Sequence, residues 1–223
     1  MAQNISSSQT LPCEDTVSLE AVSSTLLALA RIIGNAPDEQ QIRAFAATVD
    51  AMGGDAPGCR RMGEYFAQHE DRPMEQTAQE LGVDWTLAFR GVNPGNGPLP
   101  PYAGAWLAQD GVGVNVMMQI NSRYVEKGLG CGGGKLNRMD YLGVEVEFVS
   151  HLLKECAGAA SAQQRAAIAD EVAQFEDEFI LSWLPRYRAS VEAACKTEFW
   201  KGYLELLEAV LADVRDQCAL ITT

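Results

Sequence analysis

The chain has 223 residues, of which 47% are hydrophobic and 21% charged, as in an ordinary folded globular protein. Its net charge of −13 argues against nucleic acid or an anionic membrane as a partner and favours a cationic one. Six scattered cysteines without a CxxC pair indicate neither a zinc site nor a disulfide framework, so we expect free thiols. We also expect a cytoplasmic protein, because residues 1–15 do not resemble a secretory signal and no apolar run is long enough to span a bilayer.

Helical spacing of apolar residues, punctuated by caps and prolines, dominates the first ninety residues. We expect four helices here: one from Asp15 or Thr16 to Gly34, a second from Pro37-Asp38-Glu39 to Gly53-Gly54, a third after Pro57, and a fourth from about Pro73 through Phe89. Acidic residues in the first turn of the second helix complement its dipole.

A stretch rich in glycine and proline, within residues 85–107, follows the fourth helix and ends in Tyr102 and Trp106. Its prolines remove backbone donors and favour extended neighbours, so no helix can cross it. If a short helix follows Pro101, the two aromatic residues share a face. A stiff loop with large aromatic residues suits the floor of a binding groove, because little entropy is lost on binding. The alternative is a buried connector whose aromatic residues belong to the core.

Residues 112–127 have the spacing of a further helix. Its expected inward face comprises Val112, Val116, Ile120 and Tyr124. The run GLGCGGGK (128–135) lacks the spacing of a phosphate-binding loop, since Leu129 stands at the first glycine position and Leu136 at the Ser/Thr position. The letters G-x-G-x-x-G also occur here, but no strand precedes them. We interpret the run as a glycine-rich hinge.

Four further helical segments follow the hinge. Asp140 is placed to cap an apolar helix, and Ser161 opens a long helix that reaches Ile180. Pro185 must kink or break that helix. The remaining helices are expected to run through Ala194 and over residues 198–214.

No stretch shows the sustained alternation of a sheet, so we predict an all-α, compact, bundle-like fold of about nine or ten helices. Residues 1–127 are expected to form one helical half, 128–139 the hinge and 140–223 the second half of one globular unit. Because two halves can pair within one chain or between two, both a monomer and a domain-swapped homodimer remain open.

Side chains that usually carry catalysis are sparse and poorly spaced. His69 and His151 are far apart in sequence, and Glu147 with His151 does not reproduce the repeated Glu-x-x-His of di-iron bundles. Glu145 and Glu147 should point to different helix faces, which makes them a poor acid–base pair. Neither GxSxG nor HExxH occurs. We therefore expect no catalytic activity, no metal site and no bound cofactor.

Four segments together resemble one known family: GPLPPYAGAWL (97–107), WTLAF (85–89), MDYLGVEVEFVSHLL (139–153) and the helices of residues 179–211. They are similar to the Pro-Pro-aromatic motif, the aromatic-x-x-Leu-Phe segment, the Asp-His signature and the Leu-Pro-Trp helices of the TorD/DmsD family of redox-enzyme maturation chaperones. The resemblance covers residues 81–211. Two positions depart from the family pattern: Tyr141 replaces the usual His, and Asn137-Arg138 replaces Glu-Pro, which suggests a rearranged hinge.

The resemblance implies an all-helical cytoplasmic chaperone without catalytic activity of its own. Such a chaperone binds the twin-arginine signal peptide and the body of a molybdenum-cofactor oxidoreductase until the cofactor is loaded. The alternative from another class is a helical adaptor or scaffold that binds no signal peptide.

A receptor for a twin-arginine signal needs an apolar groove with aromatic anchors and a carboxylate rim, because arginine pairs best with carboxylates. The candidate peptide-binding residues are Trp85, Phe89, Tyr102, Trp106, Leu107, Asp140, Tyr141 and Glu145. Asp140 has an alternative role as a helix cap. Some of the aromatic residues are expected to belong to the core, Phe89 before the others.

Overall fold

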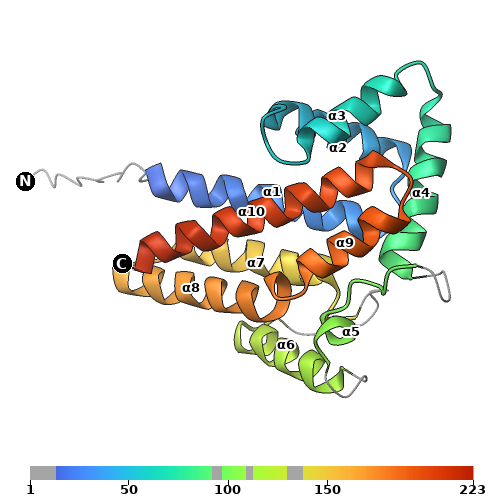
Figure 1. The fold of residues 1–223 in the computed structure, drawn as a ribbon. Coiled ribbons are helices and arrows are strands. Elements are labelled where there is room, and N and C mark those ends of the chain that lie inside the picture. Colours follow the sequence, from blue (N-terminus) through green and yellow to red (C-terminus); the bar gives the residue numbers. More distant parts are fainter. Residues whose placement is uncertain (1–13, 92–96, 109–112, 130–137, 223) are drawn as a thin grey trace, which may run out of the picture.

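A computed structural model describes residues 14–91, 97–108, 113–129 and 138–222 of the chain. Within these ranges the named elements are all helical (Figure 1). They are α1 (Glu14–Gly34), α2 (Glu39–Met52), α3 (Cys59–Gln68), α4 (Met74–Arg90), α5 (Ala103–Leu107), α6 (Val114–Glu126), α7 (Leu142–Ala157), α8 (Ala162–Phe175), the π-helical η1 (Glu176–Leu181), α9 (Leu184–Ala194) and α10 (Glu198–Thr222). The predicted all-α class is confirmed.

Helix starts follow the local chemistry of the sequence. Asp38 caps α2 in a reciprocal capping box with Gln41, and the Ser161 hydroxyl caps α8 by accepting from the Gln164 N–H at 3.1 Å. Pro185 lies in the first turn of α9, where its missing N–H costs nothing, so the chain breaks there as expected. The last helix reaches Thr222, well beyond the expected residue 214.

The prediction of one continuous α-helix from Ser161 to Ile180 is wrong in one respect. It is α-helical only to Phe175 and continues as the π-helical η1. The wider turn adds a residue to the helix, which shifts the side chains that follow. Phe179 and Ile180 are both buried in this segment.

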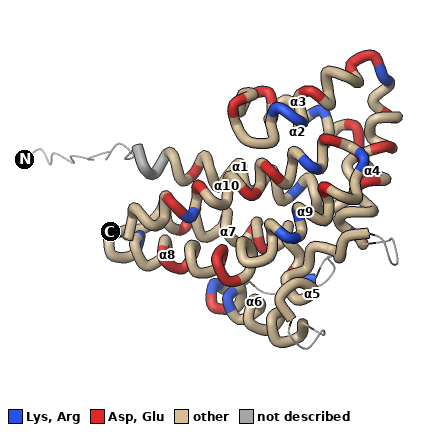
Figure 2. Tube along the Cα trace, viewed as in Figure 1, with Lys and Arg blue, Asp and Glu red and all other residues tan. Residues whose placement is uncertain are grey.

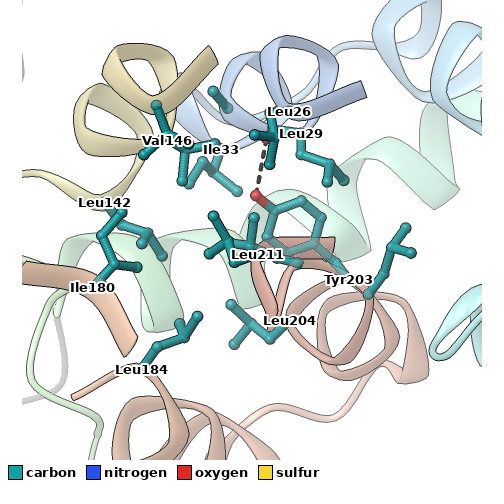
Figure 3. Packing of buried hydrophobic residues seen from close by; sticks show 14 of the residues in the cluster. Leu26, Leu29, Ile33, Leu142, Val146, Ile180, Leu184, Tyr203, Leu204 and Leu211 are labelled. Carbon is teal, nitrogen blue, oxygen red and sulfur yellow. Dashed lines mark hydrogen bonds between the residues drawn. The ribbon is translucent and has the colours of Figure 1, made fainter. Parts of the chain in front are cut away.

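The core lies where α1, α7, α8 and α10 pack along one another, with α2 and α3 over one end and α4 beside them (Figure 1). Figure 3 shows side chains from α1, α7, η1, α9 and α10 meeting around Tyr203. The buried Tyr203 hydroxyl donates to the Leu29 carbonyl at 2.9 Å. Between α1 and α7, Ser23 and Ser150 each donate to the other's backbone carbonyl at 2.8 Å. Helices from both ends of the sequence therefore share one core.

The expected division into two halves joined by a hinge stays a prediction, because most of the glycine run, residues 130–137, lies outside the described residues. None of the described helices has the length and apolar character needed to cross a bilayer.

Candidate functional site: an uncharged face built on a proline-rich segment

The proline-rich segment is fixed by the chain that precedes α7. Tyr102 and Tyr141 form an isolated antiparallel bridge, in which the Ala103 N–H donates to the Asp140 carbonyl at 2.8 Å and the Leu142 N–H donates to the Pro101 carbonyl at 2.9 Å. The rings of Tyr102 and Tyr141 lie 5.5 Å apart. The segment is therefore held by main-chain hydrogen bonds as well as by its own prolines.

Two glycines bring α5 and the start of α6 into backbone contact. A Cβ on Gly104 would lie 2.8 Å from Asp140 Oδ2 and 2.9 Å from the Gly113 carbonyl oxygen. Gly113 itself has φ of 69°, a left-handed conformation that favours glycine. Side chains larger than hydrogen at residue 104 would push α5 away from α6, so this close approach depends on the sequence.

Asp140 is fully buried at the junction of these elements and does not cap α7 as the sequence suggested. Tyr141 occupies the cap position and makes no side-chain cap hydrogen bond. The Asp140 carboxylate instead accepts from the Gly104 N–H at 3.1 Å and from Arg138, Nε to Oδ1 at 2.9 Å and Nη2 to Oδ2 at 2.8 Å. The Arg138 guanidinium also lies over the Tyr102 ring, 5.0 Å from its centroid.

Trp106 is a partly exposed ring held on several sides. It stacks on Trp183 at a centroid distance of 6.0 Å and an interplanar angle of 17°, and its edge faces Tyr187. Its Nε1–H donates to the Pro100 carbonyl at 3.1 Å. Arg186 donates to the Trp106 carbonyl at 3.2 Å and lies 5.9 Å from the ring centroid. The ring is thus preorganised while part of its surface stays open to solvent.

Three of the aromatic residues predicted to bind the peptide are instead buried in the core. Trp85 and Tyr141 both donate to the Ile33 carbonyl, at 3.1 and 2.6 Å, and both are buried. Phe89 is also buried and packs edge-on against Trp200 at 5.0 Å. The sequence led us to expect this for Phe89. The three side chains are buried and are not available on the surface to contact a partner. Leu107, in contrast, is partly exposed beside Trp106.

Glu145 is buried, and neither of its carboxyl oxygens has a hydrogen-bond partner among the described residues. Burial, and then the nearby charge of Asp140, raise the pKa of Glu145 well above its ordinary value. Burial therefore favours the uncharged form of this carboxyl and keeps it from solvent. The expected rim of accessible carboxylates does not lie at Asp140 or Glu145, because both side chains are buried.

The sequence reasoning missed an exposed apolar stripe on α6, formed by Val114, Met118 and Val125 with exposed fractions between 45% and 61%. Spacings of four and seven residues place the three on one helix face, opposite the buried Ile120 and Tyr124. The sequence could have predicted this stripe, because the helix carries apolar residues on both faces.

The stripe belongs to a surface that we call the α5–α6 face, formed by residues 97–108 and 113–126. Residues 97–108 and 113–122 contain no Lys, Arg, Asp or Glu, although Arg138 and Arg186 of other segments lie over the Tyr102 and Trp106 rings. Figure 2 shows α5 and the adjoining part of α6 without charged residues, while charges are spread over the other helices. Leu99 is a further exposed apolar side chain of this face. In a chain of net charge −13, such a face is a marked local exception.

An all-helical scaffold with an exposed apolar face is typical of proteins that bind other polypeptides. Among the described residues, no group of His, Cys, Asp and Glu is placed to hold a metal ion. A family model described as "Nitrate reductase delta subunit" matches residues 52–189, which include the whole α5–α6 face.

The chain belongs to this family, the TorD family of redox-enzyme maturation chaperones, as its motifs indicated, and it is not an enzyme. It is also 24% identical over 174 residues to "Chaperone protein TorD" of Aeromonas salmonicida (strain A449). That match covers 78% of this chain and 76% of the relative.

Proposed function

We propose that this chaperone acts in the cytoplasm and binds the twin-arginine signal peptide and the apoprotein of a molybdenum-cofactor oxidoreductase. Binding delays export while the cofactor is inserted into the client, and the chaperone itself needs no cofactor. The observation that carries the proposal is the α5–α6 face, which exposes the apolar side chains Leu99, Val114 and Met118 from segments that contain no charged residue of their own between 97 and 108 or between 113 and 122.

The apolar middle of a signal peptide fits this face. Val114, Met118 and Val125 form a stripe along α6, and Trp106 adds a large ring whose orientation is fixed by Trp183 and Pro100. A preorganised aromatic side chain next to adaptable aliphatic ones is typical of binding hot spots, because little conformational entropy is lost when the partner docks. Methionine adds a flexible contact that tolerates different apolar sequences.

The basic start of the signal peptide fits the electrostatics of the chain. Net charge of −13 attracts a cationic segment at long range and raises its association rate. Asp140 adds a built site for one guanidinium, since its carboxylate already accepts two hydrogen bonds from an arginine beside the Tyr102 ring.

Tryptophan fluorescence offers a direct test, because Trp85, Trp183 and Trp200 are buried while Trp106 is partly exposed. We expect saturable one-to-one binding of a synthetic peptide with an arginine pair followed by an apolar segment. A peptide with two alanines in place of the arginines should bind at least tenfold more weakly. Trp106→Phe is the matched control for the fluorescence signal.

Equal binding of both peptides would argue for a general helical adaptor that recognises apolar segments only. Binding of neither peptide, by a protein shown to be folded, would contradict the proposal.

A further inference from the structure

The guanidinium site at Asp140 is already filled by the chain's own Arg138. The two partners differ sharply in accessibility, since the Arg138 side chain is 50% exposed and the Asp140 side chain 0%. The accepting carboxylate of Asp140 is thus part of the protein interior, while the guanidinium of Arg138 reaches it from the surface.

The geometry is that of a receptor for arginine in particular. Two parallel N–H donors meet the two oxygens of one carboxylate, and the Tyr102 ring lies 5.0 Å from the guanidinium carbon. Lysine cannot reproduce the paired donors or the flat contact with a ring. The third hydrogen bond to Asp140, from the Gly104 N–H, holds the carboxylate in place from the protein side.

Arg138 contributes little to tertiary structure through this pair. The ion pair joins residues only two apart in sequence, whereas the Gly104 bond to the same carboxylate spans 36 residues. Because the Asp140 carboxylate is fully buried it needs a cationic partner, and Arg138, whose side chain is half exposed, can be exchanged for an equivalent guanidinium. Close by, Glu145 is a second buried carboxyl whose oxygens have no hydrogen-bond partner among the described residues, and burial favours its uncharged form.

We infer that Arg138 is an internal competitor: it occupies the guanidinium site formed by Asp140 and Tyr102, and an arginine of the client segment binds by displacing it. This inference rests on the proposed function and assigns one arginine of the client to one site. Arg138 occupies the site until an arginine of the client replaces it. Because the client can bind only while the site is open, its apparent affinity is the intrinsic affinity multiplied by the open fraction.

Removing the competitor should therefore strengthen binding. The ion pair with a buried carboxylate and the cation–π contact together leave the site open at most about one third of the time. Arg138→Ala should accordingly bind the arginine-pair peptide at least about threefold more tightly than the wild type does. The gain should disappear in the double variant Arg138→Ala/Asp140→Asn. Unchanged or weaker binding by folded Arg138→Ala would overturn the inference and leave Arg138 as a structural partner of Asp140.

A second readout needs no signal peptide. N-acetyl-arginine amide should bind Arg138→Ala saturably and raise its melting temperature, but should have no such effect on the wild type. N-acetyl-lysine amide, the matched probe, should do neither. If Arg138→Ala does not fold, Arg138→Gln keeps the stem and one donor group and serves in its place.

The two readouts separate the inference from the proposed function. Binding of the arginine amide by the variant, with no peptide bound by either protein, would contradict the signal-peptide proposal and retain the guanidinium site. No binding of the arginine amide by a folded variant would overturn the inference itself.

Discussion

Replacing Trp106 by alanine should weaken client binding strongly while the protein remains folded. In the fold, the change removes the stacking on Trp183, the edge contact with Tyr187 and the hydrogen bond to the Pro100 carbonyl. Aromatic pairs and neutral hydrogen bonds of this kind are each worth about 1 kcal/mol, so the free energy of unfolding should fall by about 2–3 kcal/mol. Domains are commonly stable by roughly 5–15 kcal/mol, and the variant should remain folded.

In binding, truncation of a central aromatic anchor typically costs about 2 kcal/mol or more, or roughly a 30-fold rise in Kd. Isothermal titration with the arginine-pair peptide measures this change without relying on tryptophan fluorescence. Denaturant unfolding of the same samples measures the stability. Val83→Ala is the matched surface control, because Val83 is an exposed apolar residue of α4, outside the α5–α6 face. Wild-type affinity in a folded Trp106→Ala would refute the assignment of Trp106 as an anchor.

Three further changes test other parts of the account. Met118→Asp should weaken peptide binding at least tenfold, because it buries a charge under the apolar segment, while Val83→Asp should not. Gly104→Ala should lower the free energy of unfolding by about 1–3 kcal/mol, since its Cβ would meet Asp140 and the Gly113 carbonyl, and a melting curve would show this. Glu145→Gln should gain stability relative to the wild type between pH 5 and pH 8, measured by denaturant unfolding. The pKa of Glu145 is raised on folding, so its favourable contribution is complete below the unfolded value of about 4.3 and is lost as pH rises toward the folded pKa. A stability difference that does not change with pH would contradict a raised pKa of Glu145 in the folded protein.

The helices were predictable because their signals are local. Asp38 and Ser161 each lie one residue before a helix and cap it with their own side chains, and Pro185 cannot continue one. Of the inward face predicted for α6, Ile120 and Tyr124 are buried as helical spacing indicates and Val116 is partly buried, while Val112 lies outside the described residues.

The site was less predictable because its contacts are long-range. Asp140 has the local appearance of a helix cap, but the Gly104 N–H, distant in sequence, competes for its carboxylate together with Arg138. The sequence does not distinguish Trp85 from Trp106 as a surface residue. Trp85 belongs to the core because its ring is buried and its Nε1–H donates to the Ile33 carbonyl. The π-helical turn of η1 likewise has no local signal that we recognised in the sequence.

The central claim is that the α5–α6 face binds the apolar segment of the client signal. Photo-crosslinking tests it most directly, with a benzophenone amino acid placed in the apolar segment of an arginine-pair peptide and the attachment sites located by mass spectrometry. The account predicts attachment within residues 97–108 and 113–126, above all at Met118 and next to Trp106, and competition by unlabelled peptide. Competable attachment confined to α2 and α3, or to α8 and α10, would contradict it.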